Sequence, residues 1–159
     1  MSSPQGMCAN LVDKGKLTSP LIIYNRTAQR AQELAAKIGG DRTTVAASVA
    51  EAVAAADIVF TCLGEDQSVS DTIDTALQGD VTGKLFVDCS TIHPTTTNAL
   101  AKAVTAKGAE FVAMPGRNRG RSGVGFEGAQ RLTSSSFRSP CDGGFWAVGM
   151  RALRPKGGR

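Results

Sequence analysis

Short apolar runs and helix-like repeats alternate along the first 115 residues of the chain. The runs at 21–24, 57–63 and 85–87 are short and apolar, which is typical of parallel strands that are covered on both faces. Weaker strands are expected at 43–45 and just before Met114. Apolar residues recur at helical spacing in segments that span 7–12, 28–38, 48–53, 66–77 and 94–107. This alternation predicts an α/β fold with a doubly wound parallel sheet.

Residues with capping roles mark several of the expected helix ends. Thr27 and Ser48 are expected N-caps, because a hydroxyl can accept a hydrogen bond from the first backbone N–H groups of a helix. Pro94 is suited to open a helix, since the N–H that it lacks is one that the first turn could not use. Gly39 and Gly108 are expected to end helices.

Residues 83–115 form the most complete unit in this pattern. They read as a buried strand, a polar loop, a helix and a second strand, which is the order of a βαβ unit. In an open α/β sheet, ligands bind outside the carboxyl ends of the strands. Ser90 and Thr91 come soon after the strand at 85–87, so they are the first candidates for a ligand site.

The composition, 42% hydrophobic and 20% charged, is ordinary for a globular domain. No apolar run reaches the roughly 20 residues that a membrane-spanning helix needs, so no membrane partner is expected. The first 16 residues lack both a basic start and a sustained apolar stretch, unlike a signal or transit peptide. A cytoplasmic location is therefore expected, with the mitochondrion as the alternative.

Cysteine and histidine give no indication of a metal site. The 4 cysteines have no C-x-x-C spacing, and the chain has a single histidine, His93. Cys62 and Cys89 lie at apolar strand ends and are expected to fill the core rather than act as nucleophiles. His93 has no neighbouring acid and precedes a proline, so we expect a loop residue rather than a catalytic base.

The composition changes abruptly after Pro115. Residues 1–115 hold 9 Lys and Arg against 12 Asp and Glu, whereas residues 116–159 hold 9 against 2. The second segment is rich in Gly, Arg and Ser and shows no periodicity, which fits a disordered or RNA-binding tail. Its sudden onset fits a mispredicted reading frame or a retained intron, and we favour this explanation. Two parts are therefore expected, 1–115 and 116–159.

The body of the chain resembles the β-hydroxyacid dehydrogenases, relatives of 3-hydroxyisobutyrate dehydrogenase and of the NADP-binding domain of 6-phosphogluconate dehydrogenase. The resemblance rests on Asp-x-Ser-Thr-Ile-x-Pro at 88–94, on the Ala-rich helix, Lys-Gly and strand that follow, on Asn-Arg-Thr at 25–27 and on Leu-Gly at 63–64. It covers roughly 7–115. It implies a Rossmann-like domain of an oxidoreductase that acts on a small β-hydroxyacid.

The resemblance also implies a cofactor site. In dinucleotide-binding folds an acid after the second strand holds the ribose 2′-hydroxyl of NAD, whereas an Arg accommodates the 2′-phosphate of NADP. Asn25, Arg26 and Thr27 stand at this place without an acid, so NADP is expected rather than NAD. Without the family, Arg26 would be read as an exposed loop cation. Leu63 and Gly64 belong to a loop that lies over the ribose and pyrophosphate in the family.

Both ends of the chain depart from the family pattern. The resemblance implies that Ser90 and Thr91 bind substrate, but no catalytic residue is assigned, because the family's Lys helix and dimerisation domain have no counterpart after Pro115. The first strand and its Gly-x-Gly-x-x-Gly turn, which bind the pyrophosphate, have no counterpart before Met7. We therefore expect a truncated domain that binds NADP weakly or not at all and is inactive as this chain.

The missing first strand predicts a slot in the sheet. In the strand order 3-2-1-4-5-6, strand 1 lies between the strands at 21–24 and 57–63. The only apolar tail segment long enough to fill this slot is 145–150, although Gly149 should weaken a strand there and nothing fixes its register. Without such a strand, two unpaired edges should make the chain prone to aggregation.

A second interpretation is a scaffold without catalytic activity whose basic tail binds RNA through phosphate contacts. Aromatic residues that would stack on bases are sparse in 116–159, which counts against nucleic acid as a partner. A cofactor that protects the chain against unfolding would favour the dehydrogenase, and salt-dependent RNA binding that is lost with the tail would favour the scaffold.

Overall fold

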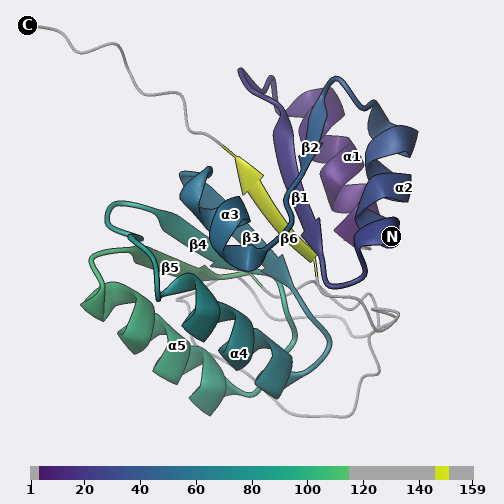
Figure 1. Ribbon diagram of the computed structural model, residues 1–159. Helices are drawn as coiled ribbons and strands as arrows, with labels where there is room; N and C mark the ends of the chain where they lie inside the picture. Colours follow the sequence, from purple (N-terminus) through teal and green to yellow (C-terminus); the bar gives the residue numbers. More distant parts are fainter. Residues whose placement is uncertain (1–3, 115–145, 151–159) are drawn as a thin grey trace, which may run out of the picture.

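The computed structural model describes residues 4–114 and 146–150, which build one six-stranded sheet and five helices (Figure 1). The helices are α1 (Pro4–Lys14), α2 (Ala28–Ile38), α3 (Val49–Ala54), α4 (Asp66–Ala76) and α5 (Pro94–Ala106). The strands are β1 (Leu21–Asn25), β2 (Thr43–Val45), β3 (Ile58–Cys62), β4 (Leu85–Asp88), β5 (Glu110–Ala113) and β6 (Trp146–Met150).

The strand order is β2-β1-β6-β3-β4-β5, and every neighbouring pair that does not include β6 is parallel. Strands and helices alternate from β1 to β5, so the predicted α/β fold with its doubly wound parallel sheet is confirmed. The β1 strand pairs with β2 and β6, and β3 pairs with β4 and β6; β1 and β3 do not pair with each other. From β6 the parallel strands continue outward in two directions, to β1 and β2 on one side and to β3, β4 and β5 on the other, so the strand order reverses at β6.

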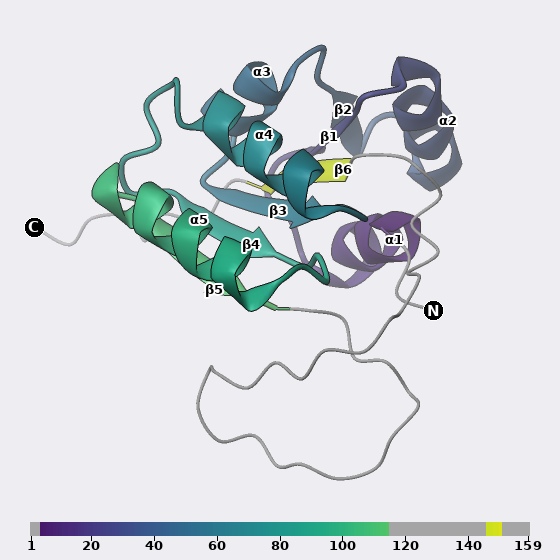
Figure 2. The same cartoon turned by 90° about the horizontal axis from the view of Figure 1, so that it is seen from below.

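Alternate residues of β1 show that helices cover both faces of the sheet. Ile22 packs in a large apolar cluster with residues of α3, α4 and α5. Leu21 and Ile23 pack in a second cluster with residues of α1 and α2. Successive side chains of a strand point to opposite faces, so α3, α4 and α5 form one layer and α1 and α2 the other. Figure 2 shows α1 and α2 near β1 and β2, and α5 beside β4 and β5.

The expected slot between β1 and β3 is filled by β6. This strand runs antiparallel to both neighbours, with Val148 opposite Ile23 on one side and opposite Phe60 on the other. The backbone groups of β1 and β3 that face the slot are thereby paired within the sheet, as buried N–H and C=O groups require. The segment 145–150, which was the only candidate for this slot but was expected to make a weak strand without a fixed register, fills it with Trp146–Met150, so the expected unpaired edges are absent here. The expected division of the chain into 1–115 and 116–159 therefore does not hold for these five residues, which belong to the sheet.

The side chain of the N-cap residue makes a capping hydrogen bond in α3 but not in α2. Ser48 caps α3 as predicted: its Oγ accepts from the N–H of Glu51 at 3.1 Å, and Glu51 Oε2 accepts from the N–H of Ala47 at 2.7 Å. The prediction for Thr27 is wrong in its mechanism. Thr27 occupies the N-cap position of α2, but its side chain makes no capping hydrogen bond.

Pro94 opens α5 as expected, and His93 is the N-cap residue. The His93 ring nitrogen Nδ1 lies 3.3 Å from the backbone nitrogen of Thr95, whose N–H it accepts, and 2.7 Å from Thr95 Oγ1. The residue thus has a local structural role in the loop that precedes α5. None of the helices in the described ranges is long and apolar enough to cross a membrane.

Candidate functional site

The carboxyl edge of the parallel strands brings the predicted site residues together. Asn25 ends β1, Cys62 ends β3 and Asp88 ends β4. The segments 25–27, 63–64 and 89–91 therefore leave the sheet at the same edge, as Figure 1 shows for the lower ends of β1 and β3. The antiparallel β6 strand begins at this edge, since Trp146 is opposite both Asn25 and Cys62.

Asn25 has an unusual hydrogen-bond balance. Its side chain is buried, with 3% of the residue exposed. The Oδ1 atom accepts from the N–H of Thr27 at 2.8 Å and so fixes the turn into α2. The Nδ2 atom is buried and has no hydrogen-bond partner in the described part of the chain. A buried donor without an acceptor costs about 1–3 kcal/mol, so this amide favours a ligand that brings an acceptor.

Arg26 and Thr27 are exposed directly beside this amide. The structure contains one ion pair within its described residues, between Arg42 and Asp13, and it does not involve Arg26. Arg26 thus follows the buried Asn25 directly in the sequence and adds an exposed positive charge to the segment that leads into α2. Positive charge, the donors of Asn25 and the N-terminus of a helix together suit an anionic, oxygen-rich group.

Asp88 is the most buried acid of the site, with 2% of the residue exposed. Its Oδ1 accepts from the Oγ1 of Thr61 at 2.9 Å and from the N–H of Ser90 at 3.1 Å. Burial raises the pKa of Asp88, and hydrogen bonds from Ser90 and Thr61 limit this rise. The carboxyl group therefore works as an acceptor that holds the end of β3 and the loop after β4.

Ser90 continues this network rather than facing solvent. The residue is 4% exposed, and its Oγ accepts from the N–H of Leu63 at 3.0 Å. Leu63 is itself buried, whereas Gly64 and Thr91 are exposed. Of the two predicted substrate residues, Ser90 lies in the interior and Thr91 lies at the surface.

Asp66 makes a second connection between the same two loops, one that the sequence pattern did not reveal. Its Oδ2 accepts from the Oγ1 of Thr96 at 2.6 Å and from the N–H of His93 at 3.0 Å. The hydrogen bond from Thr96 lowers the pKa of Asp66, and the His93 N–H adds to this effect. An acid at the first position of α4 was visible in the sequence, but its partners are the N-cap residue of α5 and a residue of its first turn, 27 and 30 residues further along.

The cysteines near the edge are poor nucleophiles. Burial raises the pKa of Cys89 to about 11, and the neighbouring charge of Asp88 adds to the rise. Cys62 is buried at the end of β3. A thiol attacks as its thiolate, so Cys89 would be almost fully protonated at neutral pH. The burial of Cys62 agrees with the expected packing role, whereas Cys89 is only half-buried and is a poor nucleophile because its pKa is raised.

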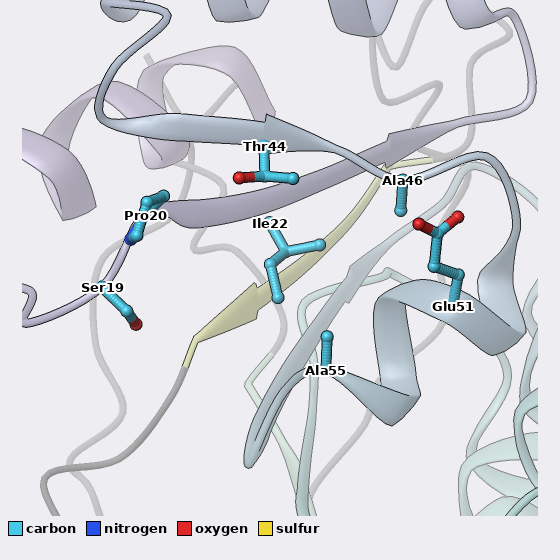
Figure 3. Close-up of a pocket in the computed structure, with 7 residues that line it drawn as sticks. All are labelled: Ser19, Pro20, Ile22, Thr44, Ala46, Glu51 and Ala55. Atoms are coloured by element: carbon cyan, nitrogen blue, oxygen red, sulfur yellow. The ribbon is translucent and has the colours of Figure 1, made fainter.

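A cavity of about 250 Å³ lies elsewhere, near the start of β1 (Figure 3). Its lining residues are Ser19, Pro20, Ile22, Thr44, Ala46, Glu51 and Ala55. Ser19 and Pro20 precede β1, whereas Asn25 ends that strand, so the cavity opens away from the carboxyl edge. The Glu51 carboxylate in its wall already accepts the N–H of Ala47. This cavity is separate from the candidate site.

Comparison with known proteins connects the chain to one family. Residues 5–122 match the NAD binding domain of 6-phosphogluconate dehydrogenase. The NADH-dependent oxidoreductase ucdB of Aspergillus ustus is 37% identical over 109 residues, which cover 69% of this chain and 38% of that protein. The human cytokine-like nuclear factor N-PAC is 30% identical over 116 residues, which cover 69% of this chain and 19% of that protein.

Solved structures give the same fold. The 3-hydroxyisobutyrate dehydrogenase of Mycobacterium tuberculosis, solved with L-serine, superposes with a TM-score of 0.59 at 30% identity and covers 70% of this chain and 37% of its own. A reductive aminase from Aspergillus terreus, solved with NADPH4, cyclohexanone and allyl amine, superposes with a TM-score of 0.57 at 24% identity. This chain spans less than two fifths of the length of these relatives. The chain belongs to the family of the NAD-binding domain of 6-phosphogluconate dehydrogenase.

Proposed function

We propose that this chain is the NADP-binding domain of an oxidoreductase that acts on a small β-hydroxyacid. Asn25, Arg26 and Thr27 hold the adenosine ribose and its 2′-phosphate in this proposal, and Leu63 and Gly64 lie along the rest of the dinucleotide. The cofactor supplies hydride transfer when it is bound. The protein's share is to bind and orient the dinucleotide at the carboxyl edge of the sheet.

The observation that carries this proposal is the buried Nδ2 of Asn25, which has no acceptor among the described residues. It lies at the carboxyl end of β1, where a doubly wound fold places the ribose of a dinucleotide. A ribose hydroxyl or phosphate oxygen would accept from this amide and relieve its desolvation. The residues present therefore fit the cofactor that the family binds.

Arg26 supports NADP over NAD. It follows Asn25 directly and is exposed, and no acid of the 25–27 segment competes for the 2′ position. A guanidinium binds a phosphate monoester through charge-assisted hydrogen bonds, whereas it gains little from a neutral hydroxyl. Relatives differ in this respect: the Aspergillus ustus enzyme is named as NADH-dependent, and the Aspergillus terreus enzyme was solved with a form of NADPH.

Thr91 is the better candidate to meet a substrate on the β4 loop. Its side chain is exposed, while the Ser90 hydroxyl is buried and already accepts from Leu63. We therefore assign Thr91 the direct contact, through a hydroxyl that can donate and accept. Ser90 supports the loop from below in this proposal.

The affinity for NADP should be weak. The slot between β1 and β3 is filled by β6, which runs antiparallel to both neighbours and enters at the carboxyl edge. No turn from strand to helix therefore follows the central strand to give backbone donors to the pyrophosphate. We expect a dissociation constant of roughly millimolar size, which corresponds to about −4 kcal/mol.

Calorimetric titration of the full chain with NADP and with NAD tests the proposal. We expect NADP to bind about tenfold more tightly than NAD, which corresponds to one charge-assisted hydrogen-bond pair. Arg26→Gln should abolish this preference, and the control Arg30→Gln, one turn along α2, should keep it. Equal affinity for both cofactors in the unsubstituted chain would contradict the NADP assignment, and a micromolar constant would show that the missing glycine turn does not matter.

A further inference from the structure

We infer that Asp88 is a positioning residue, which holds Ser90 so that the Ser90 hydroxyl fixes the backbone of Leu63 at the cofactor edge. The network connects a side chain at the end of β4 with the first residue after β3. Its effect on cofactor binding rests on the proposed function. Its effect on the order of the two loops does not.

No cation of the described residues pairs with the carboxylate of Asp88 to explain its burial. The ion pair between Arg42 and Asp13, which is the one found among residues 4–114 and 146–150, involves neither β3 nor β4. Taking a carboxyl group out of water is costly unless hydrogen bonds compensate. Thr61 and Ser90 donate these hydrogen bonds to Asp88, and the two bonds offset part of the cost of burying its carboxyl group.

An acceptor with several lone pairs suits this position. One oxygen of Asp88 accepts from a hydroxyl on the neighbouring strand and from a backbone N–H two residues further along. The second of these is an Asx-type turn, which sets the direction in which the chain leaves β4. Ser90 is thereby held with its backbone toward Asp88 and its Oγ toward Leu63.

The bond from Leu63 to Ser90 extends the pairing of β3 with β4. The last backbone pair of the two strands is Thr61 with Asp88, and the N–H of Cys89 donates to the carbonyl of Thr61 at 2.8 Å. Beyond this point the N–H of Leu63 finds its acceptor in the Ser90 side chain. Leu63 is 3% exposed, so water cannot easily replace that acceptor.

The consequence is that two loops are held as one unit. Gly64 follows Leu63, and Thr91 follows Ser90. The buried hydrogen bond between Leu63 and Ser90 therefore restrains the positions of these two exposed residues. A binding site needs its contact residues fixed by a supporting layer of hydrogen bonds. Asp88 supplies this layer without itself reaching the surface.

Amide hydrogen exchange of the full chain, followed by NMR without cofactor, tests the inference. In Asp88→Ala we expect the exchange rate of the Leu63 amide to increase at least about tenfold more than that of the Ile23 amide in β1. The reason is that local opening exposes Leu63 separately from global unfolding, whereas Ile23 reports on global unfolding. Asp88→Asn keeps an acceptor oxygen and should retain most of the protection of Leu63. Thr61→Val removes the other bond to Asp88 and should leave Leu63 no faster than Ile23.

A rise that is equal at Leu63 and Ile23 in Asp88→Ala would overturn the inference, since Asp88 would then act on global stability alone. If Asp88→Ala does not fold, Ser90→Ala decides. It should release the Leu63 amide in the same selective way, and a protected Leu63 in that variant would equally overturn the inference.

Titration with NADP separates this inference from the proposed function. Asp88→Ala and Ser90→Ala should each weaken NADP binding several-fold, and the double variant should bind no more weakly than either, because both act through one network. An unsubstituted chain that binds no NADP would refute the proposed function, and the exchange result would still decide the role of Asp88.

Discussion

Gly149 in β6 passes so close to Ala56 that a Cβ atom on the glycine would lie 2.6 Å from the Ala56 Cβ and 3.2 Å from the carbonyl oxygen of Ala52. Real Cβ atoms essentially never approach as closely as 2.6 Å, so any larger residue would force a neighbour to shift. Gly149 stands opposite Ile22 in β1 and Val59 in β3. A slip by one residue would bring a larger residue under the end of α3. The contact therefore selects the register of β6.

Gly149→Ala tests this selection. We expect the variant to lose about 1–3 kcal/mol of unfolding free energy, the usual cost of an extra methyl group in a packed core. Gly40→Ala is the matched control, because a Cβ there meets nothing within 4 Å, and its effect should stay within about 0.5 kcal/mol. Chemical denaturation measures both. Equal stability of the two variants would show that β6 does not lie under Ala56.

Removal of β6 should expose the inner edges of β1 and β3. We expect a chain that lacks residues 143–159 to lose its cooperative melting transition or to aggregate, because unpaired edges of a central slot recruit other strands. A chain that lacks only 151–159 keeps β6 and serves as the control. Thermal unfolding and light scattering give the two readouts. An unchanged melting curve and unchanged solubility after the longer deletion would rule out the inserted strand.

The alternation of apolar runs and helical repeats was enough to predict the order of the elements and the parallel sheet. The short apolar runs of strands and the 3.6-residue period of helices are local signals, and they were enough to locate β1 to β5 and the helices between them. The register of β6 was not predictable, because it depends on Ala52 and Ala56, which precede Gly149 by more than 90 residues. A glycine that weakens a strand in isolation stabilises one register where a helix passes close above it.

The site was predictable in its place and not in its internal bonds. The strand ends located Asn25, Leu63 and Ser90 at one edge, and the parallel pairing of β3 with β4 brought Leu63 and Ser90 together. The sequence did not show that Ser90 would turn inward to Leu63, since a hydroxyl at a strand end suits a ligand as well as a backbone N–H. The connections of Asp88 and Asp66 likewise depend on partners from other elements.

Asp66 predicts a pH dependence of stability. Its pKa in the folded chain lies below the ordinary value of 3.8, chiefly because Thr96 donates to the carboxylate. A depressed pKa means that Asp66 stabilises the fold fully above pH 3.8 and that this contribution is lost as the pH falls through the lower folded value. Asp66→Asn should therefore be less stable than the unsubstituted chain at pH 6. The difference should shrink at acid pH, as followed by urea unfolding. A difference that stays constant down to pH 2.5 would point to packing instead.

In the site that we propose, the end of β1 holds the adenosine part of NADP through Nδ2 of Asn25, which has no acceptor among the described residues, and an ¹⁵N-resolved NMR titration observes that amide directly. Loss of one side-chain signal pair in Asn25→Ser identifies the resonance, and the serine hydroxyl can still accept from Thr27. We predict that the Asn25 amide pair and the backbone amides of Arg26 and Thr27 shift together as NADP is added, with one common dissociation constant. Signals of these residues that stay in place while other parts of the chain respond to NADP, or a spectrum that does not respond at all, would contradict the claim.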